Sequence, residues 1–464
     1  MTDETVKFDP NQNQLEAPLY GVSESLLVEI TGAIQKNDIA QLESLTEPLH
    51  VADIADLISK LESEERRSYL QLIKHRLDPE ILTFIEDPIK EEVLEIVGTK
   101  GVARAITSLE SDDAIHLIED LDEKQQRAVL RYVPAQDRAM LEEALAYPED
   151  SAGRLMQRHL VCVPTFWKAK EVIDFIREAQ DLPENFYDIY VVDPRHHPIG
   201  VISCDKLVRH SPSISVGEIM DPDLKTVPVE MDQEEVALLF SHYALLSVPV
   251  IDHADRIVGM ITVDDIVDVI EEEAEEDIMH LAGVRESDFH APIVKTSYWR
   301  SRWLFVTLIS AVIASFVISQ FGESIEEKVA LSFLMTIVAA MGGNSGMQTV
   351  TVTVRALATR ELMSANTWKS IAKEMFVGLM NGCIFAVALG GIVYFWQRDL
   401  SLSLILGISI ICIMLWSGVA GVCMPIIVQR LGMDPAISAG PMLTTTTDIL
   451  GFAIFLGLAT YFLL

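Results

Sequence analysis

The sequence predicts a multidomain integral membrane protein with an all-α superhelical N-terminal domain, an α/β middle region, an acidic connecting helix and a five-helix transmembrane domain. Three observations lead to this fold class. The long apolar segments lie after residue 302, the residues before about 150 carry apolar side chains at helical spacing, and the region between them holds a repeated unit with strand-like runs.

The charges of the chain are divided in the same way. From Lys295 onward there are 10 Lys/Arg and 8 Asp/Glu, so the whole-chain totals of 35 and 69 leave 25 basic and 61 acidic residues before that point. The membrane part is therefore nearly neutral, and the soluble part carries a formal charge of −36. So acidic a surface excludes nucleic acid as a partner, because phosphate binding needs positive charge.

The first 150 residues predict a tail followed by a helical domain. We expect a tail or a first helix at residues 1–30 and a helical N domain at 31–150, where ADIADLISKLESEERRSYLQLI (52–73) aligns with DDAIHLIEDLDEKQQRAVLRYV (112–133). At an offset of 60 residues, Leu57 meets Leu117 and Ile58 meets Ile118. Helical repeats of this kind stack into a superhelix, and a plain helical bundle is the alternative.

A second repeat occupies the middle of the chain. GRLMQRHLVCVPTFWKAKEVIDFI (153–176) and GEIMDPDLKTVPVEMDQEEVALLF (217–240) share Gly, Met and Val-Pro at an offset of 64 residues. The runs YVV, GVIS, VPVI and GMIT that follow are typical of short strands between helices. The pattern resembles tandem CBS domains, regulatory modules that pair into a disc, with the first at 151–213 and the second at 214–269.

The resemblance to CBS domains implies a nucleotide site. Family members often bind adenosine nucleotides such as ATP, and the second copy keeps the matching residues as Gly259, Thr262 and Asp265. In the first copy Lys206 stands where the aspartate belongs, so the second copy is the expected site. A purely structural dimerisation module is the alternative.

Residues 270–298 form the expected acidic connecting helix and linker. Six of the seven residues from Glu271 to Asp277 are acidic. Like charges three or four residues apart repel each other on a helix, so counterions would stabilise this segment. It is either a solvated spacer or a cation-binding connector.

The transmembrane domain is expected at residues 299–464, where five apolar segments each reach the length of about 20 residues that spans a bilayer. With the N-terminus inside, eight basic residues flank the inner ends of the spans and two flank the outer ends, as the positive-inside rule requires. We therefore expect a multi-pass protein of the cytoplasmic (inner) membrane, with the N-terminus in the cytoplasm and the C-terminus outside.

Two membrane segments contain polar residues. Asp448 is the sole charged residue from Pro435 to the chain end, and the last span holds no base to pair with it. The second span reads AAMGGNSGMQT at residues 339–349, where glycines would break or thin the helix or, as small residues, let neighbouring helices approach closely, and Asn344 and Gln348 begin a polar stripe. A charged group at membrane depth costs at least about 2.5 kcal/mol, so it faces a cavity or a partner. A water-filled path for cations fits both segments.

With MGGNSGMQTVTVTVRALATREL in the second span and DPA…GPMLTTTTDILGF in the fifth, the order of domains resembles the MgtE family of magnesium transporters. One departure is Thr336, where the family usually has proline. The resemblance implies a homodimer in the membrane lipid, with an Mg²⁺ pore between the subunits and no enzymatic activity. It also implies that Mg²⁺ bound to the acidic soluble domains closes the pore.

The residues expected to contact Mg²⁺ fall into two groups. In the membrane they are Asp448, whose carboxylate would hold a hydrated ion, with the carbonyls of Gly440 and Thr444 and the amide of Asn344; Asp434 is the expected partner of the connector. The candidate regulatory residues are Asp252, Asp255, Asp264, Asp268, Glu271, Glu272, Glu275, Glu276 and Asp277.

Two other functions remain open. The same fold could carry Co²⁺, Mn²⁺ or Ni²⁺, although oxygen ligands without His or Cys favour harder cations. Alternatively, the chain could be a membrane-anchored nucleotide sensor, for which Asp448 and a polar second span would have no use.

Overall fold

The computed structural model describes residues 21–463, apart from residues 75, 86, 120, 180–181, 184, 282, 285–292 and 364. The chain divides into two compact units, Met1–Ile270 and Glu271–Leu464. The expected tail, up to residue 20, and part of the expected linker lie outside the described residues.

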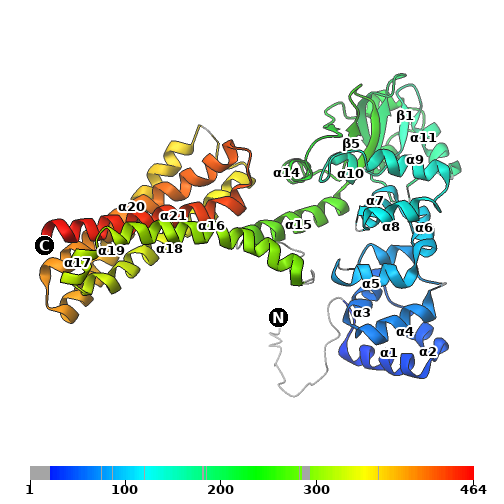
Figure 1. Ribbon diagram of the computed structural model, residues 1–464. Coiled ribbons are helices and arrows are strands. Elements are labelled where there is room, and N and C mark those ends of the chain that lie inside the picture. The colour runs from blue at the N-terminus through cyan, green and yellow to red at the C-terminus, as the bar shows by residue number, and fades with distance from the viewer. Residues whose placement is uncertain are drawn as a thin grey trace, which may run out of the picture. The chain divides into compact units, whose positions relative to one another are not determined.

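The first part of unit 1 is all-α, as predicted. Its helices, with one 3₁₀ turn, are α1 (Glu24–Lys36), α2 (Ile39–Thr46), α3 (Val51–Lys60), α4 (Ser63–Ile73), η1 (Pro79–Leu82), α5 (Asp87–Val97), α6 (Thr99–Ser108), α7 (Ser111–Glu119), α8 (Glu123–Leu130) and α9 (Ala135–Ala144). The first helix begins at Glu24, inside the segment expected as a tail or first helix. Helices pack against near neighbours in sequence, such as α4 on α5 and α5 on α6, which favours the stacked superhelix over a bundle (Figure 1).

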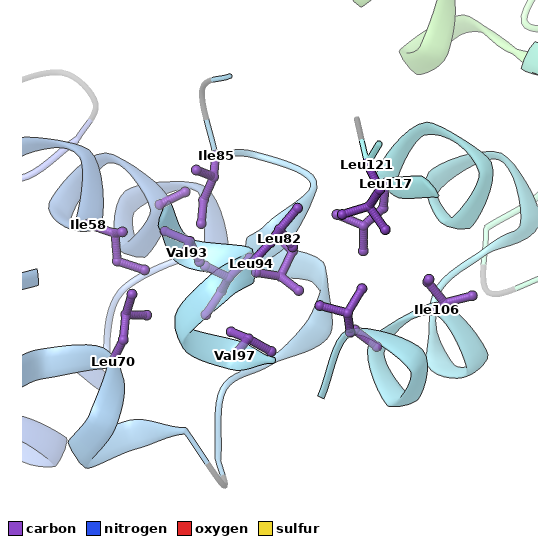
Figure 2. Packing of buried hydrophobic residues seen from close by; sticks show 14 of the residues in the cluster. Ile58, Leu70, Leu82, Ile85, Val93, Leu94, Val97, Ile106, Leu117 and Leu121 are labelled. Atoms are coloured by element: carbon purple, nitrogen blue, oxygen red, sulfur yellow. The ribbon is translucent and has the colours of Figure 1, made fainter. Parts of the chain in front are cut away.

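The two predicted repeat units share one hydrophobic core. Ile58 and Leu61 in the first unit and Ile118 and Leu121 in the second are all buried at matching positions. Figure 2 shows side chains from both units in the same cluster, with Leu82 and Leu94 between them. The 60-residue repeat in the sequence is therefore a structural repeat.

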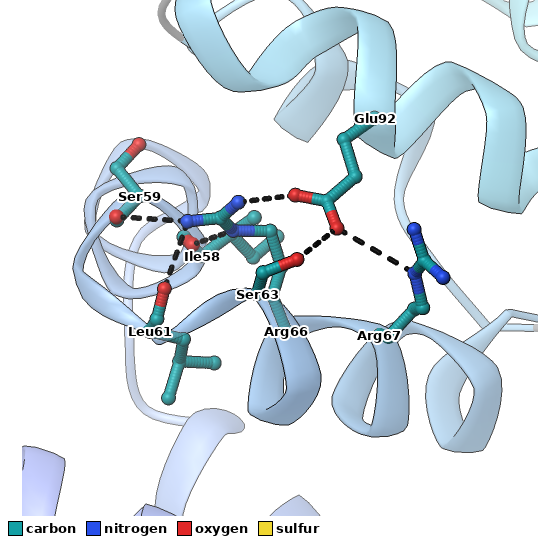
Figure 3. A network of polar contacts seen from close by, with 7 residues as sticks. All are labelled: Ile58, Ser59, Leu61, Ser63, Arg66, Arg67 and Glu92. Carbon is teal, nitrogen blue, oxygen red and sulfur yellow. Dashed lines mark hydrogen bonds and ion pairs between the residues drawn. The ribbon is translucent and has the colours of Figure 1, made fainter.

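One polar side chain closes the turn between the two helices of each unit, and in the first unit this side chain is buried. The Arg66 guanidinium, in a residue only 7% exposed, donates to the carbonyls of Ile58 (2.8 Å) and Leu61 (2.8 Å) and to Glu92 (2.5 Å) (Figure 3). Sixty residues later, the Gln126 amide donates to the carbonyls of Ile118 (3.0 Å) and Leu121 (3.0 Å). The second unit thus keeps the backbone contacts without the charge.

The second part of unit 1 contains two α/β lobes. Their strands are β1 (Cys162–Pro164), β2 (Asp188–Val192) and β3 (Pro198–Ser203) in one lobe, and β4 (Val227–Pro228), β5 (Ser247–Ile251) and β6 (Ile257–Thr262) in the other. The helices are α10 (Ala152–Leu155), α11 (Ala169–Glu178), α12 (Cys204–Arg209), α13 (Val216–Ile219), α14 (Gln233–Tyr243) and α15 (Val263–Leu281), the last of which continues into unit 2. In each sheet the middle strand pairs in parallel with the first strand and antiparallel with the third.

The two lobes exchange the segments that precede their strands. Gln157, before the first lobe, pairs with Met260 in the second, whereas Asp221, before the second lobe, pairs with Val201 in the first. Met156 accordingly belongs to the core of the second lobe. Residues 152–157, which the boundary expected at residue 151 assigns to the first CBS domain, therefore pack with the second lobe.

Gly200 and Gly259 make this exchange possible. A Cβ on Gly259 would lie 2.8 Å from the carbonyl oxygen of Gln157, and one on Gly200 would lie 2.9 Å from that of Asp221. Only glycine permits such a close approach of two backbones. This packing explains the Gly259 of the expected nucleotide motif without a ligand.

The all-α part contacts the second lobe through α7. Arg154 and Arg158 pair with Glu119 and Glu143, and the Ser111 hydroxyl accepts a bond from the Arg158 amide (2.8 Å). Acidic residues meet at the same contact. They are Glu110, Asp112 and Asp113 on one side and Asp264, Asp265 and Asp268 on the other, with His116 beside Asp113.

Unit 2 contains α16 (Ile293–Ser319), α17 (Gly322–Glu327), α18 (Ala330–Ala358), α19 (Thr367–Gln397), α20 (Leu400–Arg430) and α21 (Pro435–Leu463). Among the described residues, five helices are long and apolar enough to cross a membrane, as predicted; α17 is too short. The helices α18 to α21 pack together, and α16 lies against α21 (Figure 1).

The glycines of the second span do not break it. Helix α18 runs without interruption through Gly342 and Gly346, so the expectation of a break was wrong and the alternative of close helix packing is confirmed. A Cβ on Gly342 would lie 2.6 Å from the Ile413 side chain, and one on Gly346 would lie 2.7 Å from Leu443. These glycines let neighbouring helices approach closely. Thr336 keeps α18 regular, and its hydroxyl bonds the carbonyl of Phe333 (2.8 Å).

Arg66 provides a test of the repeat packing. Arg66→Ala would leave two buried carbonyls and Glu92 without their donor, so we expect a local loss of about 3 kcal/mol. In the full-length protein, amide hydrogen exchange in α3 and α4 should accelerate about 100-fold. The neighbouring Arg67, which is 59% exposed and 3.6 Å from Glu92, is the matched control. Arg67→Ala should change exchange little, and equal effects of the two variants would contradict the assignment.

The acidic contact between α7 and α15 should depend on pH. Burial raises the pKa of Asp265 to about 7, and burial together with the charge of Asp265 holds the pKa of Asp112 well above its usual range. A carboxyl group whose pKa is raised by packing stabilises the packed state at low pH, and this contribution is lost as pH rises from about 4 through about 7.

We therefore expect hydrogen exchange in α7 to accelerate between pH 5 and pH 8 in the absence of divalent cations, after correction for the intrinsic rate. Asp112→Asn should remove most of this dependence, whereas Glu142→Gln, at an exposed acid of α9, should retain it. An unchanged pH profile in the Asp112 variant would exclude the contact as its source.

Candidate functional site

The membrane site is centred on α21. Thr444 and Asp448 lie one helical turn apart on the same face, and Gly440 lies one turn before Thr444. Asp448 is partly buried, and among the described residues no hydrogen bond or ion pair joins its carboxylate to another group. The absence of a basic partner that the sequence suggested therefore extends to the neighbouring helices. A carboxylate in this position can accept a cation.

The carbonyl oxygens near Asp448 are engaged within the helix. The Gly440 carbonyl accepts a bond from the Thr444 hydroxyl (3.1 Å), and α21 continues through both residues. One acceptor is released nearby, because Pro441 has no N–H to donate to the carbonyl of Ile437. The use of the Gly440 and Thr444 carbonyls as ion ligands stays a prediction.

Helix α18 supplies the second wall. A Cβ on Gly343 would lie 3.9 Å from the Thr447 hydroxyl, so the part of α18 that holds Asn344 lies beside the part of α21 that holds Asp448. Asn344, Gln348 and Thr351 are exposed on α18 in a single protomer. Thr349 and Thr353 are buried, so only part of the predicted polar stripe is open.

Glu374 is an acidic residue that the sequence reasoning missed. It lies in α19 with its side chain 18% exposed, and its carboxylate accepts a bond from the buried Thr349 hydroxyl (3.2 Å). It directly precedes the apolar run that begins at Met375, so the run itself does not include it. Its position eight residues into α19 could have indicated that it is packed between helices.

Asp434 lies at the start of the last span and contacts the connecting helix. His280, whose side chain is 12% exposed, places Nδ1 2.9 Å from Asp434 and Nε2 3.2 Å from Glu276. Asp277 is close enough to Asp434 that burial and the charge of Asp434 raise the pKa of Asp277. The predicted partnership of Asp434 with the connector thus occurs through His280, which the sequence reasoning did not identify.

The remaining regulatory candidates differ in their surroundings. Asp252 closes the β5–β6 turn; burial alone would raise its pKa, but bonds from Arg256 and from turn amides lower it. Asp255 lies in the same turn with a φ of 56°. In contrast, Asp264 and Asp268, which are exposed on α15, lie near Asp113 at the acidic contact. Farther along α15, Glu271, Glu272, Glu275 and Glu276 are also exposed.

No group of three or more His, Cys, Asp or Glu side chains is arranged to hold a metal ion within the part of the chain that the structure describes. A carboxylate shell would therefore need ordered water or a second chain to complete it. Asp112 and Asp113, which lie near Asp264 and Asp265, were not singled out from the sequence. Asp112 is buried and Asp113 is partly buried, and this burial depends on the fold and not on the local sequence.

The expected nucleotide residues are used within the protein. The Thr262 hydroxyl donates to Asp265 (2.7 Å), and Asp265 faces Asp112. In the first lobe, the Ser203 hydroxyl donates to Asp205 (2.6 Å) and Lys206 approaches Asp221 (3.7 Å). Nucleotide binding at Gly259, Thr262 and Asp265 stays a prediction.

Comparisons with known proteins identify three parts of the chain. Family models match at residues 335–458 (MgtE, divalent cation transporter), 49–150 (MgtE intracellular N domain) and 216–272 (CBS domain). The cytosolic domain of the Mg²⁺ channel MgtE, solved in complex with ATP, is 32% identical, with a TM-score of 0.49, over 52% of this chain and 99% of that chain.

Two curated relatives match along nearly their whole length. The magnesium transporter MgtE of Thermus thermophilus is 32% identical, over 94% of this chain and 98% of that protein. The magnesium transporter MgtE of Bacillus subtilis is 28% identical, over 95% of this chain and 98% of that protein. With its N domain, its CBS domains and its five apolar helices in the same order, the chain belongs to the MgtE family of magnesium transporters.

Proposed function

We propose that the chain forms a homodimeric, Mg²⁺-selective channel for magnesium uptake, which closes when cytosolic Mg²⁺ binds its acidic soluble domains. The observation that carries the proposal is the Asp448 carboxylate, which lies in a membrane-spanning helix without a basic partner among the described residues. Mg²⁺ releases its waters reluctantly and is usually held by one or two carboxylates through retained water. Asp448 from each of two subunits supplies such a pair.

The exposed polar face of α18 supports a pore between subunits. Asn344, Gln348 and Thr351 would meet lipid in a single protomer, which is unfavourable for polar groups at membrane depth. A second copy placed against α18 and α21 would enclose these groups with Asp448 in a polar path.

The direction of transport follows from the proposed orientation. We place the soluble unit in the cytoplasm and the membrane domain in the cytoplasmic membrane, as the loop charges favour. A membrane potential of 100 mV then contributes about 4.6 kcal/mol to the entry of a divalent ion, at about 2.3 kcal/mol for each charge. Uptake needs no other energy source.

Closure follows from the repulsion between carboxylates. Asp112 and Asp265 face each other, and Asp277 faces Asp434, so each pair is costly when ionised. Mg²⁺ between such groups would replace repulsion by attraction and draw the acidic surfaces together. The transported ion would then also be the inhibitor, bound at a separate site.

Another divalent cation is the main alternative substrate. The groups near Asp448 that the structure describes are oxygen and amide groups, which favour Mg²⁺ over softer metals. Competition of Co²⁺, Mn²⁺ and Ni²⁺ with Mg²⁺ in a flux assay decides between them.

Asp448→Asn should abolish Mg²⁺ uptake. The substitution keeps the size of the side chain and removes its charge. Two unit charges 4 Å apart interact with an energy of about 4 kcal/mol at an effective dielectric constant of 20, so the Mg²⁺ flux should fall at least 100-fold. The measurement is dye-reported Mg²⁺ influx in proteoliposomes. Glu326→Gln, at an exposed acid of α17, is the control and should conduct normally. Normal influx through a well-folded Asp448→Asn protein would exclude the pore assignment.

Neutralising the connector should prevent closure. We expect the combined change of Glu271, Glu272, Glu275 and Glu276 to Gln to leave the channel conducting at millimolar Mg²⁺, because the carboxylates that bind the inhibitory ion are lost. Patch-clamp recording with Mg²⁺ on the cytoplasmic side measures this. The control neutralises the same number of exposed acids in the first lobe: Glu178, Asp205, Glu218 and Asp223. If both proteins close at the same Mg²⁺ concentration, the connector has no part in sensing.

A further inference from the structure

A cavity of about 310 Å³ lies inside unit 2 where the end of α15, the first turns of α16 and the start of α21 meet. This volume is at the lower end of the range of small-molecule sites, roughly 300–1,000 Å³. Its lining includes His280 and Val284 from the connecting segment, Ile437 from the last span, and Trp299, Arg300, Arg302 and Trp303 from the first span. None of the proposed pore residues lines it.

The cavity is positively charged. Arg300 and Arg302 both belong to its lining, and none of the lining residues that the structure describes is acidic. His280, at the edge of the lining, is contacted by Glu276 on one ring nitrogen and by Asp434 on the other. The described lining is therefore basic and is complementary to an anion.

The arginines are accompanied by aromatic rings. The Arg302 guanidinium lies 4.8 Å from the centre of the Trp299 ring, which holds it by a cation–π contact. Trp303 lies one turn after Trp299 and also lines the cavity, so two indoles and two guanidiniums share one end of the helix. Guanidinium groups bind phosphate through paired N–H donors, and indole N–H groups can donate to the same oxygens.

The position along α16 places these groups at a membrane surface. The membrane-spanning part of α16 begins at Thr296, so the four side chains occupy its first two turns. Tryptophan is enriched at that depth, and arginine extends its charge from there toward the lipid headgroups. Arginines that only flank a membrane span would not require a cavity beside them, whereas a bound lipid headgroup would occupy such a cavity.

We propose that this cavity binds the phosphate headgroup of an anionic phospholipid, taken from the membrane face on which the soluble unit lies. The phosphate is held by Arg300 and Arg302, and the headgroup lies between Trp299 and Trp303. Basic pockets between membrane helices bind anionic headgroups in this way. Because His280 and Ile437 line the same cavity, the bound lipid touches the connecting helix and the last span together.

The test measures lipid retention by the full-length protein and needs no transport assay, so its outcome is separate from that of the proposed function. The protein is delipidated in neutral detergent, given phosphatidylglycerol or phosphatidylcholine, and examined by native mass spectrometry. We expect phosphatidylglycerol to be retained and phosphatidylcholine to be lost. The combined change Arg300→Gln with Arg302→Gln should weaken phosphatidylglycerol retention about 30-fold, because each arginine near an anionic surface contributes about fivefold.

The matched control removes two exposed basic residues from other helix ends, by Lys369→Gln with Arg430→Gln, and should retain the lipid. The combined change Arg300→Lys with Arg302→Lys preserves the charge and should give intermediate retention, which separates binding from misfolding of the Gln variant. Equal losses in the Gln variant and the matched control would show that only diffuse surface charge acts. Equal retention of the two lipids, or displacement of phosphatidylglycerol by millimolar inorganic phosphate, would also overturn the proposal.

Discussion

The free-energy cost of placing a carboxylate at membrane depth, where water is scarce, is the main constraint on this protein. Asp448 lies within a membrane-spanning helix, partly buried and without a bonded partner among the described residues. Such a group is stable only if something positive or aqueous faces it. The packing of the domain is consistent with this requirement: glycines bring α18 against α20 and α21 tightly enough to exclude water on one side, while Asn344 and Thr444 leave the other side polar. Dense packing and one open polar face are therefore two parts of the same arrangement.

The soluble unit also contains carboxylates whose burial costs free energy. Asp112 and Asp265 are buried against each other, and their raised pKa values are the measure of that cost. A proton or a cation can stabilise a contact of this kind, and removal of either weakens it. The arginine and serine contacts beside it keep the surfaces aligned. Fixed contacts and titratable ones therefore lie side by side at this interface.

Periodic patterns in the sequence predicted the elements well, because periodicity reports burial. The repeated strands, the paired helices and the membrane spans were all identified in this way. Contacts between residues far apart in the sequence were missed. The glycines of α18 were interpreted either as a break or as a packing surface, and the structure has the packing surface, because a helix in an apolar bundle gains more from close packing than it loses in backbone freedom. Glu374, Asp112 and His280 look ordinary in the sequence, since each depends on a partner at least 25 positions away, which is Thr349, Asp265 and Asp434 respectively. The segment exchange between the lobes was equally invisible, because a repeat shows which segments are alike and not which ones pair.

That exchange affects how the protein is made. Residues 152–157 pack on strands that end at Thr262, so the second lobe is completed only after the chain has passed through the whole first lobe and returned. The first lobe in turn waits for Asp221. On the ribosome, neither lobe can reach its final packing as soon as its own strands emerge, and the two mature almost together. Helix α15 follows Thr262 directly, so the segment that leads to the membrane spans leaves the ribosome just as the soluble unit becomes complete.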